Sequence, residues 1–175
     1  MSKNILITGC SSGLGLALAK LYIKKDYKVY GISRTRPEIN DKNFHHIKCD
    51  LSKLSRIKKT LKDRLREIGK FKLVYLNAGM LGPIEAMSKI DIDEIKEVMD
   101  LNVYANKELL DILRKTEVRQ IIGISSGASK NGSFGWGPYS LAKAGINMLM
   151  NIYSNEVPQA RVFAVAPGVI ETPMT

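Results

Sequence analysis

The chain has 175 residues, 45% of them hydrophobic, and a formal net charge of +10. This length suits one hydrophobic core, so we expect a single domain over residues 1–175. No apolar run approaches the roughly 20 residues that cross a bilayer, and the N-terminus lacks a signal-peptide pattern. Together with the presence of only two cysteines, these features favour a cytoplasmic protein.

The net positive charge could indicate a nucleic-acid-binding protein, but the lysines are dispersed along the chain. We therefore interpret most of the charge as a solvated surface and expect neither nucleic acid nor membrane as a partner. The two histidines, His45 and His46, are adjacent and would point to opposite faces of a strand. A histidine-based metal site or catalytic triad is therefore not expected.

Strand-like apolar runs alternate with helix-like segments along the chain. Strands are expected at Ile5–Ile7, Val29–Ile32, a run ending at Cys49, Leu73–Leu76, a run ending near Ser125, and Arg161–Ala166. Helices are expected from Leu14, over residues 51–68 with Ser52 as cap, along an apolar stripe from Ile92 to Leu113, and from Pro138 to about Asn155. Only about ten residues, 34–43, join the second and third strands, which leaves room for at most a short helix. The alternation predicts an α/β fold with a parallel sheet covered on both faces.

A glycine-rich loop, Gly9-Cys-Ser-Ser-Gly13-Leu-Gly15, stands between the first strand and the first helix. Glycines let the backbone approach a pyrophosphate, and the helix N-terminus supplies amide donors and a favourable dipole. The spacing is GxxxGxG rather than the commoner GxGxxG, and such a turn can also serve packing alone. Its place at the first strand–helix junction favours a dinucleotide site.

Tyr139 and Lys143 are four residues apart in a segment that Pro138 would open as a helix. Their side chains would project from one face, where an ammonium beside a phenol stabilises the phenolate. We therefore expect the pKa of Tyr139 to fall toward neutrality, as suits a proton-transfer group.

Two other motifs overlap this region. Gly123-Ile-Ser125-Ser-Gly127 fits the G-x-S-x-G turn of α/β-hydrolases, but no histidine follows it to complete a triad. Ser140-Leu-Ala-Lys143 fits S-x-x-K, but the partner motifs of penicillin-binding enzymes are missing. We interpret both as coincidences.

Six motifs occur in the order and approximate spacing of one family: Thr8–Gly15, Asn77-Ala-Gly79, Asn102-Val103, Ser126, Tyr139-xxx-Lys143 and Pro167-Gly168. The chain thereby resembles the short-chain dehydrogenase/reductase family over residues 5–172. The resemblance implies a three-layer doubly wound Rossmann sheet of about six strands, in the order 3-2-1-4-5-6, that binds NAD or NADP. It also implies a homodimer or homotetramer.

The resemblance further assigns roles to individual residues. The catalytic set would be Asn102, Ser126, Tyr139 and Lys143. Contacts to the cofactor would come from Gly9, Ser12, Gly13, Leu14, Gly15, Asp50, Leu51, Asn77, Ala78, Gly79, Tyr139, Lys143, Pro167, Gly168, Ile170 and Thr172. Asn102 also lies on the expected buried stripe, so it is either a packing amide or the asparagine of a proton relay.

The end of the second strand bears on the choice of cofactor. An acidic residue there binds the ribose 2′-hydroxyl of NAD, whereas an arginine accommodates the 2′-phosphate of NADP. This chain has Ser33-Arg34-Thr35-Arg36 and no carboxylate before Glu38. We therefore expect Ser33 and Arg34 to bind NADP in preference to NAD, unless the arginines are simply solvated loop residues.

The sequence stops at Thr175, whereas members of the family usually continue into a substrate-covering helix pair and a seventh strand. We expect that this portion is missing from the sequence or that another chain covers the exposed edge. The predicted function is an NADP(H)-dependent oxidoreductase that interconverts a carbonyl and an alcohol, with Tyr139 as general acid/base. The segment Glu156–Arg161 is similar to sepiapterin- or benzil-reductase-like members. The alternatives are a non-catalytic nucleotide-binding protein on the same fold and a basic nucleic-acid-binding protein.

Overall fold

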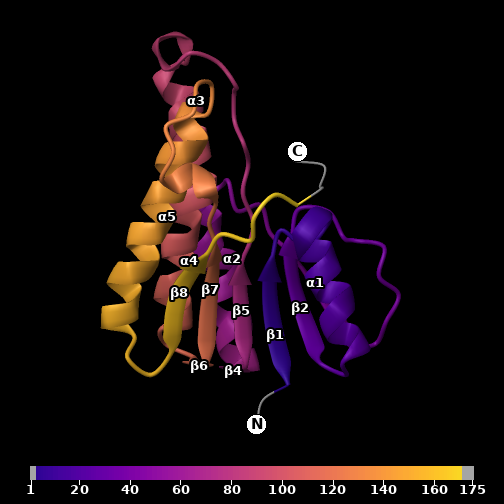
Figure 1. Ribbon diagram of the computed structural model, residues 1–175. Coiled ribbons are helices and arrows are strands. Elements are labelled where there is room, and N and C mark those ends of the chain that lie inside the picture. Colours follow the sequence, from indigo (N-terminus) through magenta and orange to yellow (C-terminus); the bar gives the residue numbers. More distant parts are fainter. Residues whose placement is uncertain (1–2, 171–175) are drawn as a thin grey trace.

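The computed structural model describes residues 3–170 of the chain. At its centre is a six-stranded sheet in the order β3-β2-β1-β5-β7-β8, in which every neighbouring pair is parallel (Figure 1). These strands are β1 (Asn4–Thr8), β2 (Lys28–Ser33), β3 (Phe44–Lys48), β5 (Leu73–Leu76), β7 (Gln120–Ile124) and β8 (Arg161–Val165). The doubly wound parallel sheet predicted from the sequence is confirmed. Two further strands, β4 (Lys70–Phe71) and β6 (Glu117–Val118), form a separate pair that is too short to leave a sequence pattern.

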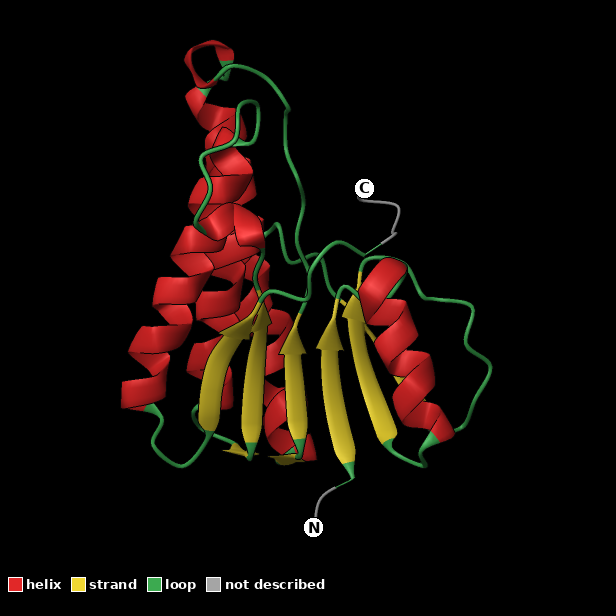
Figure 2. Cartoon of the chain, in the orientation of Figure 1, coloured by secondary structure: helices red, strands yellow, loops and turns green. Residues whose placement is uncertain are grey.

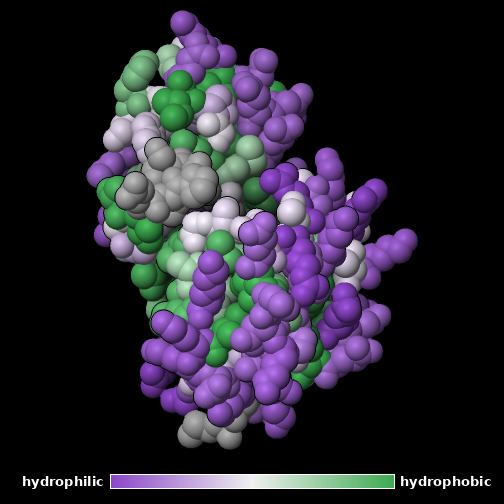
Figure 3. Space-filling model, turned by 90° about the vertical axis from the view of Figure 1, so that its right-hand side faces the viewer, coloured by the Kyte–Doolittle hydropathy of each residue, from purple (hydrophilic) through white to green (hydrophobic). Residues whose placement is uncertain are grey.

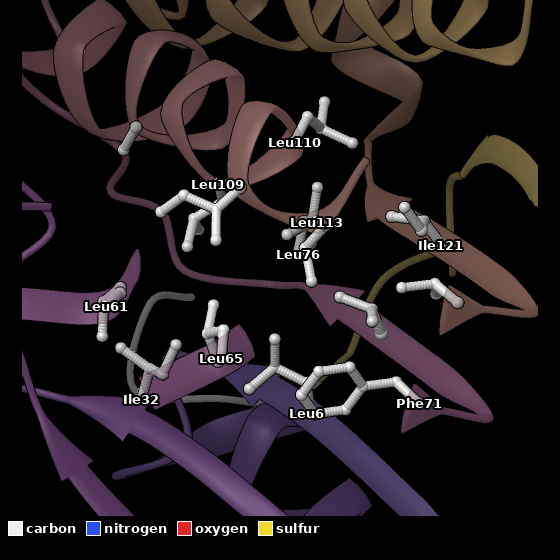
Figure 4. Close-up of a cluster of buried hydrophobic side chains, with 14 of the residues drawn as sticks. Leu6, Ile32, Leu61, Leu65, Phe71, Leu76, Leu109, Leu110, Leu113 and Ile121 are labelled. Carbon is white, nitrogen blue, oxygen red and sulfur yellow. The ribbon is translucent and has the colours of Figure 1, made fainter. Parts of the chain in front are cut away.

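Side chains of the strands alternate between two hydrophobic clusters, one on each face of the sheet. Ile5 and Ile7 of β1 pack on the side of α1 (Gly13–Lys24), whereas Leu6 between them faces the other side. That other side is covered by α2 (Leu54–Ile68), α4 (Ala105–Leu113) and α5 (Gly137–Glu156). Figure 4 shows part of this larger cluster, where leucines of α2 and α4 meet side chains of the sheet.

The long helix expected from Ile92 to Leu113 is interrupted. α3 (Ile92–Met99) leads into a π-helical turn (Asp100–Tyr104), in which the N–H of Ala105 donates to the carbonyl of Asp100, and α4 follows. Such a turn adds one residue to the helix and rotates the residues before it against those after it. The predicted buried stripe is therefore wrong at its start, where Ile92 is 63% exposed, and correct from Asn102 onward.

The expected helix cap at Ser52 is also wrong. α2 begins at Leu54, with Lys53 in the cap position. The N–H and hydroxyl of Ser52 both donate to Oδ1 of Asp50, at 3.1 and 2.8 Å. A charged carboxylate makes stronger hydrogen bonds than a neutral acceptor, so Ser52 bonds to Asp50 and does not cap the helix. Residues 34–43, all of them described, contain no helix.

Because the strands of the main sheet are parallel, they all end at one edge (Figure 2). The loop after β1, the segments after β2 and β3, Asn77 after β5 and Ser126 after β7 therefore gather at this edge. Ligands of open α/β sheets bind outside the carboxyl ends of the strands. The predicted motifs thus meet where such a ligand binds.

Hydrophilic side chains cover most of the side of the molecule seen in Figure 3, which carries α1 and the segment after β2. None of the helices between residues 3 and 170 has the length and hydrophobicity of a membrane span. The same residues contain no group of three or more histidine, cysteine or acidic side chains that could hold a metal ion.

Candidate active site

The glycine-rich loop makes a tight turn between β1 and α1. Gly9 has a φ of +67°, a left-handed conformation that favours glycine. A Cβ atom on Gly9 would lie 2.8 Å from Cα of Ala78, and one on Gly15 would lie 2.2 Å from the carbonyl oxygen of Gly9. The turn can therefore form only if both positions lack a side chain.

The first turn of α1 is suited to an anion. Among the described residues, no side chain caps this helix at Ser12, and its first turn holds no acidic residue. Ser12 is exposed, and Gly13 and Leu14 are half-buried. Uncapped amides and the positive end of the helix dipole favour a phosphate group. The loop and the helix terminus together fit the pyrophosphate of a dinucleotide.

Thr8, the last residue of β1, ties this loop to the segment after β5. Its hydroxyl accepts hydrogen bonds from the N–H groups of Asn77 and Ala78, both at 2.9 Å. In return, the side-chain amide of Asn77 donates to the carbonyls of Thr8 (2.9 Å) and Gly9 (3.2 Å). The side chain of Asn77 thus holds the loop. Sequence reasoning gave Thr8 no role of its own, although a threonine that ends a buried strand next to a glycine turn was a usable signal.

The residues expected near the adenosine end separate into buried and exposed groups. Ser33 is buried, and its hydroxyl donates to the carbonyl of Thr35 at 2.7 Å, while its contact with a cofactor stays a prediction. Arg34 is exposed. Partial burial acts to raise the pKa of Asp50, but hydrogen bonds from Ser52 and the charge of Arg34 outweigh it and lower the pKa. Leu51 is buried in the larger core cluster.

The structure brings Tyr139, Lys143 and Ser126 together. Tyr139 and Lys143 lie one turn apart on α5, with Nζ of Lys143 5.3 Å from the centre of the tyrosine ring. Ser126, after β7, hydrogen-bonds to the side chain of Tyr139. Trp136 packs edge-on against Tyr139 with ring centres 5.7 Å apart, whereas Phe134 is 84% exposed.

The pKa of Tyr139 shifts in the direction opposite to the prediction. Burial raises the pKa of the phenol, and the hydrogen bond with Ser126 only partly offsets this. Lys143 is itself buried, which lowers the pKa of its ammonium to about 8, and its Nζ donates to the carbonyl of Ile124 at 2.7 Å. The expected fall toward neutrality is therefore wrong, because the loss of solvation on burial disfavours the charged phenolate. Tyr139 is accordingly protonated at neutral pH.

Asn102 is buried in the π-turn and holds the backbone of Met80 from both sides. Its Nδ2 donates to the carbonyl of Met80 and its Oδ1 accepts from the N–H of Met80, each at 2.8 Å. The buried amide of Asn106 donates in turn to the main-chain carbonyl of Asn102 at 2.8 Å. These contacts match the packing role foreseen for Asn102, and its role in a proton relay stays a prediction.

The segment after β8 carries the last predicted contacts. Pro167 and Gly168 are exposed, Gly168 has a φ of +85°, and Ile170 is half-buried. In the view of Figure 1 this segment runs from the end of β8 across the ends of the strands toward α1. Thr172 lies outside the described residues.

Comparison with known proteins decides the family. A family model described as short chain dehydrogenase matches residues 3–175. The chain belongs to the short-chain dehydrogenase family. It is accordingly an NAD(P)-dependent oxidoreductase, as the motifs predicted.

Several relatives of this short-chain dehydrogenase are similar over nearly the whole chain. An uncharacterized oxidoreductase of Schizosaccharomyces pombe is 37% identical, over 98% of this chain and 72% of that protein. A benzil reductase of Saccharomyces cerevisiae that forms (S)-benzoin is 34% identical, over 99% of this chain and 74% of that protein. A crystal structure of a short-chain dehydrogenase/reductase from the same yeast matches with a TM-score of 0.87 at 29% identity, over 99% of this chain and 73% of that one.

Proposed function

We propose that this short-chain dehydrogenase reduces a small-molecule ketone to an alcohol with NADPH, and that Tyr139 protonates the carbonyl oxygen. The observation that carries the proposal is the meeting of Tyr139, Ser126 and Lys143 at the sheet edge that also holds the glycine-rich loop. When bound, NADPH supplies the hydride that adds to the carbonyl carbon.

Tyr139 is the proton donor in the proposed reduction. Since burial raises its pKa, the phenol carries a proton at neutral pH and can donate it to an oxygen that becomes negative. The Ser126 hydroxyl, which acts on the phenol of Tyr139 by hydrogen bonding, would orient the same oxygen. The ammonium of Lys143, close to the tyrosine ring, stabilises the phenolate that is left after the proton moves. These three side chains therefore fit the proton transfer of the proposed reduction.

The choice of NADPH is supported by charge at the end of β2. Arg34 and Arg36 are exposed there, and the first carboxylate after the strand is Glu38. A guanidinium pairs with a phosphate through two parallel hydrogen bonds, whereas the 2′-hydroxyl of NADH offers it no charge. NADPH should therefore bind more tightly than NADH.

The substrate class is suggested by the relatives together with the aromatic wall of the site. Proteins at 34% and 30% identity carry the name benzil reductase, and Trp136 stacks edge-on against Tyr139 in this chain. An aryl ketone or α-diketone offers both a carbonyl for Tyr139 and a ring for Trp136. A panel of diaryl diketones, alkyl ketones and aldehydes, read by loss of nicotinamide absorbance, would rank these classes.

Replacement of the phenol tests the chemistry directly. Tyr139→Phe should lower kcat by at least about 100-fold, the usual contribution of a positioned proton donor, while the Kd for NADPH changes less than about twofold. Tyr104→Phe, on an exposed tyrosine, is the matched control and should leave both unchanged. Turnover of Tyr139→Phe near the wild-type rate would refute the mechanism. Tight NADPH binding by the wild type without turnover of any carbonyl would instead favour a non-catalytic nucleotide-binding protein.

A further inference from the structure

The Ser33 hydroxyl is the centre of a partly buried hydrogen-bonded cluster that joins three elements. It donates to the carbonyl of Thr35 at 2.7 Å. Its oxygen also lies 3.0 Å from Nε2 of His46, on β3, and 3.4 Å from Sγ of Cys10, in the glycine-rich loop. The cluster therefore connects the turn after β2 with both the glycine-rich loop and β3.

Counting protons fixes the direction of each bond. A serine hydroxyl has one proton and two lone pairs, and the carbonyl of Thr35 can only accept, so it takes that proton. Both remaining contacts must then donate to Ser33. His46 must carry a proton on Nε2, and Cys10 must be a thiol, in keeping with the way burial raises its pKa. Every donor and acceptor of the Ser33 hydroxyl is thereby used.

The Ser33 cluster adjoins an exposed turn that carries two arginines. Arg34, Thr35 and Arg36 are exposed, but the residues on either side of them, Ser33 and Pro37, are buried. The bond from Ser33 to the carbonyl of Thr35 bends the exposed segment back on its own anchor. His46, on β3, contacts the hydroxyl of Ser33 from the neighbouring strand.

We propose that His46 is a positioning residue for recognition of the cofactor's 2′-phosphate. By donating from Nε2 to Ser33, it keeps the turn over residues 34–36 in the shape that presents Arg34 and Arg36 to a phosphate monoester. The inference rests on the proposed use of NADPH. It distinguishes two adjacent histidines, because His45 is exposed and stacks on Tyr30 with ring centres 5.0 Å apart.

The test compares phosphate-dependent binding in matched variants. His46→Leu removes the donor, His46→Gln keeps an amide donor of similar reach, and His45→Leu changes the neighbouring ring only. Dissociation constants for NADPH, NADH, 2′,5′-ADP and 5′-AMP are measured by fluorescence titration or calorimetry, with thermal unfolding to verify the fold. His46→Leu should weaken the binding of NADPH and of 2′,5′-ADP by about tenfold, which corresponds to about 1.4 kcal/mol. The dissociation constants for NADH and 5′-AMP should change less than about twofold. His46→Gln should recover most of the loss, and His45→Leu should resemble the wild type.

The possible failures are distinguishable. Equal affinity of the wild type for NADPH and NADH would overturn the proposed NADPH preference, and the role of His46 with it. A wild-type preference that His46→Leu leaves intact, or an equal loss for all four ligands, would overturn the positioning role alone. If His46→Leu does not fold, Ser33→Ala removes the acceptor instead, and it must show the same selective loss for the proposal to stand.

Discussion

The buried ammonium of Lys143 should make the stability of this protein depend on pH in a way that can be calculated. Its pKa falls from 10.5 to about 8 on burial, a difference of about 2.5 units. At 1.36 kcal/mol per unit, the charged form costs the folded state about 3 kcal/mol when the pH is below 8. Between pH 8 and 10.5 the unfolded chain binds the proton and the folded chain does not, so stability rises with pH across this window.

Lys143→Met keeps the length of the side chain and removes the charge. Urea unfolding followed by circular dichroism at pH 7 and pH 9.5 gives the free energy of unfolding of both proteins. The wild type should gain about 2 kcal/mol relative to Lys143→Met between these pH values, since most of the penalty is relieved there. Lys20→Met replaces an exposed lysine, and its free energy of unfolding should change between these pH values by the same amount as that of the wild type. Parallel curves for Lys143→Met and the wild type would refute the desolvation argument.

Two further substitutions test how the glycine-rich loop is built. Gly15→Ala should weaken NADPH binding by at least about tenfold, because its Cβ would fall 2.2 Å from the carbonyl oxygen of Gly9. Gly132→Ala, which meets nothing within 4 Å, is the control in the same titration, and equal affinities would count against the tight-turn model. Thr8→Val should lower the free energy of unfolding by about 2–4 kcal/mol, since the N–H groups of Asn77 and Ala78 lose their acceptor. Thr35→Val at an exposed position serves as its control, and a loss below about 0.5 kcal/mol in Thr8→Val would contradict this account.

The parts of the fold that were predictable are those encoded locally. Buried parallel strands such as Leu73–Leu76 appear in the sequence as short apolar runs, and the strand–glycine–helix junction at Gly9 has few other interpretations. These patterns, together with the family motifs, indicated the strand order and the meeting of Ser126, Tyr139 and Lys143.

The features that were missed depend on where the chain packs. The π-turn at Asp100–Tyr104 breaks the helical period that placed Ile92 on a buried face, and nothing in the apolar pattern marks the extra residue. The contact of the Ser33 hydroxyl with Nε2 of His46 depends on the pairing of β2 with β3. The pKa of Tyr139 was predicted from one neighbour alone, and the desolvation that decides it arises only when the helix is packed against the sheet.

The central position of β1 has a consequence for how the protein folds during synthesis. Ile5 pairs with Leu73, and the hydroxyl of Thr8 finds its partners at Asn77 and Ala78. At about 5–20 residues per second, a ribosome takes several seconds after β1 to synthesise Leu73, Asn77 and Ala78. Passage through the exit tunnel delays these contacts further. Until then β1 can pair with β2 alone, and such long-range closure is slow. A nascent chain shorter than about 80 residues therefore lacks most of the contacts that hold the end of β1 and the glycine-rich loop after it, so these contacts form late in folding.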